Sequence, residues 1–175
     1  YGLRRAANGI LQIVWDKNIS IDLYNLVLEL TEHWKSLFPY YNNNFSLLSD
    51  SILNFFRHRF IYLLEESGID NDLVQSIAGE TIHIERLLLD PLDVIKRANF
   101  LSMIRKNGCL SKLQGVVTRA TRLADHSSIP LTVLSSTNYV DSNLFEKQSE
   151  DKLLKLVNKL TPIALSSDQN RYEKL

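Results

Sequence analysis

Apolar side chains along this chain recur every three or four residues, in segments that prolines separate. Such spacing places apolar side chains on one face of an α-helix. Proline suits the gaps between helices because it has a fixed φ and no N–H group to donate. The four prolines are Pro39, Pro91, Pro130 and Pro162. No segment shows the sustained alternation of a half-buried strand, so the sequence predicts an all-α fold, a helical bundle.

The residues at the segment ends predict where the helices begin and stop. Ser20 is a candidate N-cap, Gly68 and Gly79 are candidate stops, and Asp90 followed by Pro91 has the form of a helix start. The region 127–138 is rich in serine, threonine and asparagine, which predicts a loop. The predicted helices cover about residues 3–14, 21–37, a long stretch ending at 68, 73–78, 91–106, 111–124 and 149–160.

Composition excludes several classes of protein. With 45% hydrophobic residues in 175, the chain is too apolar for a disordered segment. The longest apolar run, Phe60 to Leu64, is five residues, whereas a membrane-spanning helix needs about 20. The single cysteine, Cys109, cannot form an internal disulfide, which favours an intracellular setting. Because the chain opens on Tyr1 and its one methionine is Met103, we expect a fragment of a longer protein.

Charge is unevenly distributed although the formal net charge is zero. Residues 62–85 hold six acidic side chains and no Lys or Arg, whereas residues 86–126 hold eight basic and three acidic ones. A basic stretch on helices can neutralise phosphates, which is how most nucleic-acid affinity arises. An ordinary solvated helix surface is the alternative interpretation. The basic residues are Arg86, Lys96, Arg97, Arg105, Lys106, Lys112, Arg119 and Arg122.

Two arginines lie in an aromatic stretch, Phe55-Phe56-Arg57-His58-Arg59. Arg59 is in line with Ile52, Phe56 and Leu63 at helical spacing, which predicts a buried structural contact for Arg59. Arg57 lies off that line, which predicts a solvated or ligand-facing side chain.

The sequence contains no pattern typical of a catalytic or cofactor site. It has no Gly-x-Gly-x-x-Gly and no Gly-Lys-Ser/Thr loop that would hold phosphates. The four histidines form no His-x-x-x-His pair, and one cysteine cannot anchor a cysteine-based zinc site. We therefore predict no catalytic residue, no metal site and no bound cofactor in this segment.

Five motifs in order resemble one family, the β subunit of the bacterial, heterotetrameric glycyl-tRNA synthetase. Tyr1 to Ile10 resembles its Leu-Arg-Arg-Ala-Ala-x-Gly signature, and Phe55 to Arg59 its Phe-x-x-Arg helix. Asp90 to Asp93 is similar to a helix start of the family. Val116 to Ala124 is similar to its Lys-Arg-x-x-Asn-Ile segment, but retains only the arginine, Arg119. Val140 to Glu150 matches Val-Asp-x-x-Leu-Phe-x-x-x-x-Glu.

The resemblance implies the C-terminal part of that subunit. It implies that residues 1–85 are the end of an HD-like body with connecting helices. It further implies that residues 86–175 belong to a helical domain like the anticodon-binding domain of arginyl-tRNA synthetase, truncated at its C-terminus. The missing part would include the family's last helices.

The resemblance also implies a function. The parent enzyme is a cytoplasmic ligase, of bacterial or plastid origin, that joins glycine to its tRNA using ATP, with glycine activation in a separate α subunit and an α2β2 assembly. This segment would bind glycine tRNA without carrying a catalytic site. Phosphate contacts would come from Arg97, Arg105, Lys106, Arg119 and Arg122. Tyr40 and Tyr139 are candidates for stacking on unpaired bases.

A second hypothesis is a helical scaffold for protein interaction. In that case the segment would dock the α subunit or the rest of the β subunit. It predicts an exposed apolar patch and little affinity for RNA.

Overall fold

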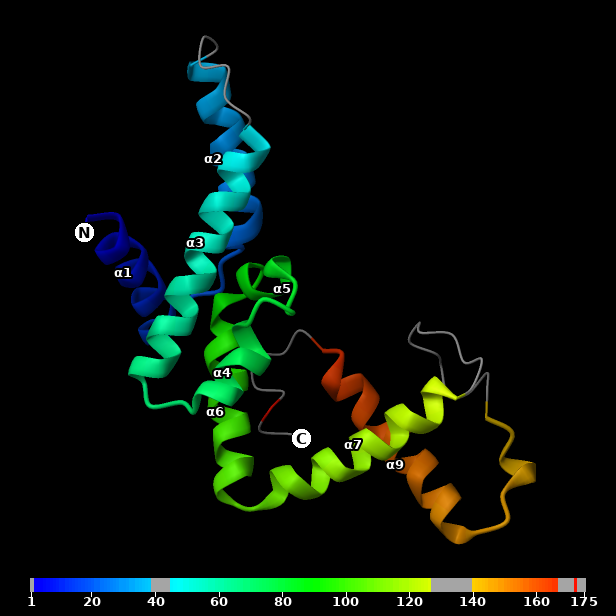
Figure 1. Ribbon diagram of the computed structural model, residues 1–175. Helices are drawn as coiled ribbons and strands as arrows, with labels where there is room; N and C mark the ends of the chain where they lie inside the picture. The colour runs from blue at the N-terminus through cyan, green and yellow to red at the C-terminus, as the bar shows by residue number, and fades with distance from the viewer. Residues whose placement is uncertain (1, 39–44, 127–139, 167–171, 173–175) are drawn as a thin grey trace. The chain divides into compact units, whose positions relative to one another are not determined.

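The computed structural model describes residues 2–38, 45–126, 140–166 and 172 (Figure 1). Within these ranges all the regular structure is helical, which confirms the predicted all-α fold. The α-helices are α1 (Gly2–Asp16), α2 (Leu23–Leu37), α3 (Phe45–Glu66), α4 (Asn71–Ala78), α5 (Ile84–Leu88), α6 (Pro91–Lys106), α7 (Cys109–Asp125) and α9 (Gln148–Ala164), with the 3-10 helix η1 (Ser142–Leu144).

The chain forms two compact units, Tyr1–Lys106 and Asn107–Leu175. Helix α6 packs against α1, α4 and α5 and so belongs to the first unit, and our predicted division between residues 85 and 86 lies within α5. The assignment of an HD-like body and an anticodon-binding-like domain stays a prediction.

The first unit is organised around α3, its longest helix (Figure 1). Helices α1 and α2 both pack along α3, and α4 and α5 pack against it as well. Most of the fully buried side chains of this unit belong to α3 through α6, with Leu11 from α1. The largest of them are Leu11, Phe60, Leu64, Val74, Ile77, Leu87, Leu88, Pro91, Leu92 and Val94.

A half-buried tryptophan contact joins the first and last helices of this unit. The Trp15 ring lies 6.0 Å from the Phe60 ring, centroid to centroid. Its Nε1 donates a hydrogen bond of 2.8 Å to the carbonyl oxygen of Pro91. An indole N–H that is shielded from water usually finds such an acceptor. This contact therefore orients α1 and α6 relative to the core.

Helix ends agree with the sequence in most places and differ in two. Asp90 accepts from the backbone N–H of Asp93 at 3.2 Å, as the predicted helix start requires. The N-cap of α2 is Asp22, whose carboxylate accepts from Asn25 at 2.9 Å, so our prediction of Ser20 was wrong. Pro162 was predicted to lie between helices but lies in the last turn of α9, where only one intrahelical hydrogen bond is lost.

In the second unit, neither α7 nor α9 has a buried residue. The predicted loop at 127–138 lies outside the described residues, as do Tyr40 and Tyr139. No helix among the described residues is long and apolar enough to cross a membrane.

Candidate functional site

The five predicted phosphate-binding residues fall in both units. Arg97, Arg105 and Lys106 lie on α6 in the first unit, whereas Arg119 and Arg122 lie on α7 in the second. Some of these side chains already form ion pairs with carboxylates, whereas others are exposed to solvent and show no ion pair among the described residues.

Arg97 is held against its own helix. Its Nε lies 3.1 Å from a carboxylate oxygen of Asp93, one helical turn earlier, and both side chains are only 12% and 14% exposed. A pair at this spacing neutralises charge within the helix. Arg97 is therefore largely withdrawn from the surface that a polyanion would contact.

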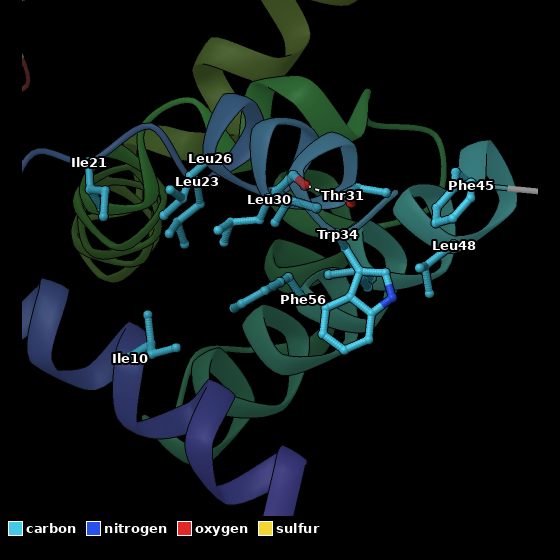
Figure 2. A pocket seen from close by; sticks show the side chains of 12 residues that line it. Ile10, Ile21, Leu23, Leu26, Leu30, Thr31, Trp34, Phe45, Leu48 and Phe56 are labelled. Atoms are coloured by element: carbon cyan, nitrogen blue, oxygen red, sulfur yellow. Dashed lines mark hydrogen bonds between the residues drawn. The ribbon is translucent and has the colours of Figure 1, made fainter. Parts of the chain in front are cut away.

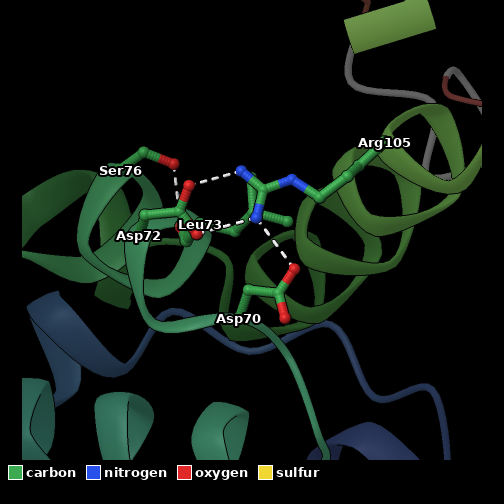
Figure 3. Close-up of polar contacts among 5 residues, drawn as sticks. All are labelled: Asp70, Asp72, Leu73, Ser76 and Arg105. Atoms are coloured by element: carbon green, nitrogen blue, oxygen red, sulfur yellow. Dashed lines mark hydrogen bonds and ion pairs between the residues drawn. The ribbon is translucent and has the colours of Figure 1, made fainter. Parts of the chain in front are cut away.

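Arg105 is bound by two carboxylates from the neighbouring helix α4 and the residue before it (Figure 3). One terminal nitrogen donates to Asp70 at 2.8 Å and to Asp72 at 2.7 Å, and the other donates to Asp72 as well. This two-pronged geometry is the strong form of an arginine–carboxylate pair. The hydrogen bond from Arg105 holds the pKa of Asp72 below its usual value, and the same bond raises the pKa of Arg105. Phosphate binding by Arg105 would have to displace these carboxylates.

This ion pair predicts a pH dependence of stability. Because the pKa of Asp72 is lower in the folded chain, the pair stabilises the fold above the unfolded-state pKa and this stabilisation is lost as the pH falls through the folded-state pKa. In urea unfolding, the stability difference between wild type and Asp72→Asn should therefore shrink as the pH is lowered below about 4. Glu29→Gln, at an exposed site on α2, is the matched control. An equal difference at pH 6 and pH 2.5 would show that the pair contributes nothing.

Helix α7 presents cations that face solvent. Lys112, Arg119 and Arg122 are exposed, and among the described residues the structure shows no ion pair with any of them. Lys112 and Arg119 are seven residues apart and Arg122 follows three later, so all three lie toward one side of the helix. Asp125 is the only acidic residue of this helix. We call these three cations the α7 basic edge.

An apolar stripe runs beside the α7 basic edge. Leu113, Val116, Val117 and Leu123 recur at helical spacing, which places them on one side of α7, and they are between 51% and 74% exposed. The helical spacing was right, but within the described residues no partner covers this face. Large exposed apolar patches mark interaction surfaces.

A larger apolar groove lies in the first unit, between α1 and α2 on the surface of α3 (Figure 2). It has a volume of about 780 Å³. Of its twelve lining residues only Thr31 and Trp34 carry polar side-chain atoms, and the Thr31 hydroxyl already donates to the Val27 carbonyl at 2.7 Å. A groove whose lining offers at most one indole N–H, that of Trp34, is poorly suited to orienting a polar metabolite, but it suits the apolar face of a helix. The lining residues are Ile10, Ile21, Leu23, Leu26, Val27, Leu30, Thr31, Trp34, Phe45, Leu48, Ile52 and Phe56.

The two arginines of the aromatic stretch differ from what the sequence predicted, because Arg57 is the more buried of the two. Arg57 is 7% exposed and donates to the carbonyl oxygens of Ala78 at 3.3 Å, Gly79, and Ile82 at 2.7 Å. Burial lowers the pKa of Arg57 while the charge of Glu80 opposes this effect. Arg59 is half-buried and lies over the rings of Phe55 and Tyr62. Arg57 is a buried structural arginine, so the prediction of a solvated or ligand-facing Arg57 was wrong, whereas the buried contact predicted for Arg59 is found only in part.

Comparison with known proteins supports one family. Residues 1–79 match the family model described as Glycyl-tRNA synthetase beta subunit. The whole chain is 36% identical to the Glycine–tRNA ligase beta subunit of Trichodesmium erythraeum and 37% identical to that of Acaryochloris marina, covering 24% of each. The subunit of Buchnera aphidicola subsp. Schizaphis graminum is 30% identical over 89% of the chain, which is 20% of its own length. No solved structure matches.

These similarities extend along the chain but not along the relatives. The chain spans about a quarter of the length of the curated relatives it matches. They do not bear out our expectation that this quarter is the C-terminal part of the subunit. The matched region 1–79 includes α1 to α4 and therefore all twelve residues that line the apolar groove. The sequence motifs, the match of residues 1–79 and the identity along the entire chain agree, and this chain is similar to glycyl-tRNA synthetase beta subunits.

Proposed function

We propose that this chain is a tRNA-binding helical segment of a glycyl-tRNA synthetase β subunit, and that it supports the ATP-dependent attachment of glycine to its tRNA. The observation that carries this proposal is the α7 basic edge, Lys112, Arg119 and Arg122, exposed on a helix with one acidic residue. The partners would be glycine tRNA and the α subunit, in a cytoplasmic α2β2 enzyme. ATP would be used by the parent enzyme, and no cofactor is proposed for this segment.

The α7 basic edge would act through the RNA backbone. Each arginine that pairs with a phosphate releases a counterion, so affinity falls as salt rises. Lys106 ends α6 and is exposed, so it can contribute one further contact. Arg97 and Arg105 contribute less because carboxylates already hold them. We therefore narrow the principal phosphate contacts to the α7 basic edge and Lys106.

A double replacement tests this assignment. Arg119→Ala with Arg122→Ala should weaken binding to glycine tRNA on the order of tenfold or more and reduce the salt slope by roughly two contacts, because each phosphate contact contributes about one. Fluorescence anisotropy with labelled tRNA measures both quantities. The double variant Lys152→Ala and Lys159→Ala removes the same charge from exposed sites on α9. Unchanged binding by a folded Arg119 and Arg122 variant would refute the assignment.

Docking of another protein segment is the second candidate function, and the apolar groove favours it. Leu30, Trp34 and Ile10, all groove residues, are between 43% and 58% exposed. Burying side chains of this size contributes roughly 1.5–3 kcal/mol each. The α subunit or the rest of the β subunit would supply the covering helix.

Placing one negative charge in the apolar groove tests the docking function separately from tRNA binding. Leu30→Asp should weaken binding of the chain to the α subunit or to the rest of the β subunit at least about tenfold, because it places a charge in an apolar contact. Sedimentation velocity of the mixtures measures this. Leu47→Asp is the control, since Leu47 is 60% exposed on α3 but does not line the groove. Equal weakening by both variants would argue against docking at the groove.

A further inference from the structure

Arg59 is held between two aromatic rings on one side of α3. Its guanidinium carbon lies 5.6 Å from the Phe55 ring centroid and 5.7 Å from that of Tyr62. Residues three and four positions apart are neighbours on a helix, so the three side chains form one continuous row. Attraction between the cation and the ring faces stabilises this arrangement. We call Phe55, Arg59 and Tyr62 the α3 stack.

The charge of Arg59 is not matched by a carboxylate among the described residues, unlike those of Arg97 and Arg105. Its Nε is buried and has no hydrogen-bond partner, and the side chain is half-buried. A partly desolvated cation costs free energy unless an anion compensates it. Because the Nε is closed to solvent, an incoming anion would pair with the terminal nitrogens of the guanidinium.

The exposed ring beside Arg59 indicates which kind of anion fits. Tyr62 is 45% exposed, and its hydroxyl reaches Glu66 at 3.4 Å, which steadies the ring. A protein carboxylate needs only the guanidinium. Unpaired nucleotides use both features, because a phosphate pairs with arginine and a base stacks on an aromatic ring or a guanidinium plane.

We propose that the α3 stack binds unpaired nucleotides of RNA, with Arg59 paired to a phosphate and Tyr62 offering its ring to a base. This inference rests on the proposed tRNA-binding function and adds a contact on the first unit to the one on α7. It assigns the site to Phe55, Arg59 and Tyr62, and it gives the Phe55 ring the role of supporting the guanidinium.

The inference is tested by measuring how the 175-residue chain binds two labelled RNAs. These are glycine tRNA and a single-stranded RNA of about twelve nucleotides. Arg59→Gln should weaken binding of both about tenfold and lower the salt slope by about one contact. Tyr62→Leu should weaken binding but leave the salt slope unchanged, because it removes stacking and no charge. Arg59→Lys should recover the slope but not the full affinity. Lys17→Gln removes one exposed charge from the first unit as the control.

Each outcome separates this inference from the α7 assignment. If binding depends on Arg119 and Arg122 but folded Arg59→Gln binds as wild type does, the α3 stack is refuted and the proposed function stands. If binding depends on Arg59 and Tyr62 alone, the α3 stack is supported and the α7 assignment fails. If wild type binds neither RNA, both fail. Binding of polyglutamate that Arg59→Gln abolishes, without RNA binding, would assign Arg59 to a protein carboxylate and also overturn the inference.

Discussion

Replacement of Arg57 by alanine is expected to lower the free energy of unfolding by about 3 kcal/mol or more. The side chain donates to three backbone carbonyl oxygens between residues 78 and 82, and it is 7% exposed. Truncation leaves these acceptors without a donor in a region that water enters poorly, and each such loss costs about 1–3 kcal/mol. The turn after α4 would then lose its connection to α3.

Chemical denaturation monitored by circular dichroism measures this effect. Arg57→Lys should be destabilised as well, because one ammonium group cannot reproduce the fork that reaches three carbonyls. Arg4→Ala, at an exposed site on α1, should change stability by less than about 0.5 kcal/mol. An Arg57→Ala chain as stable as the Arg4→Ala chain would contradict the structural role of Arg57.

Phe60→Ala should destabilise the first unit by about 3–5 kcal/mol. Phe60 is 0% exposed and its ring contacts that of Trp15, which in turn donates to the Pro91 carbonyl. Removing the ring leaves a cavity where α1, α3 and α6 meet. The exposed variant Leu47→Ala should have little effect. If Phe60→Ala unfolds with the same denaturant midpoint as Leu47→Ala, the core is placed wrongly.

Most helices could be predicted because their apolar spacing and end residues are local features. The long helix α3 ends just before Gly68, whose φ of 80° suits glycine. Gly79 follows α4, and a Cβ there would collide with the Gln75 carbonyl oxygen. The start of α2 was less predictable, because Ser20 and Asp22 are both good caps and backbone geometry decides between them. The five residues of α5 are too few to show a period.

The roles of the two arginines show where local pattern fails. Leu53, Phe60 and Leu64 are buried at helical spacing, and Arg57 is in register with them, so a signal for its burial was present in the sequence. The helical spacing of Phe56 and Leu63 instead placed Arg59, and not Arg57, on the apolar side of the helix. Arg57 is buried because it donates to carbonyl groups more than twenty residues further along the chain, and only the fold brings these groups to α3.

Which basic residues are free to bind RNA also depends on contacts between residues far apart in the sequence. Asp93 lies four residues before Arg97, so that ion pair was visible in the sequence. Asp70 and Asp72 are 35 and 33 residues from Arg105, and only the packing of α4 on α6 brings them together. Charge counting therefore identified the basic stretch but could not distinguish its paired cations from the exposed ones on α7.

Anisotropy of labelled glycine tRNA with this chain, measured across a salt series beside a noncognate tRNA, tests the central claim most directly. The account predicts binding at low salt that weakens steeply as salt rises, with a slope that the Arg119 and Arg122 replacements reduce by roughly two contacts. A well-folded chain that binds neither tRNA at low salt would contradict the tRNA-binding function. The apolar groove would then be the main support for a docking role in the β subunit.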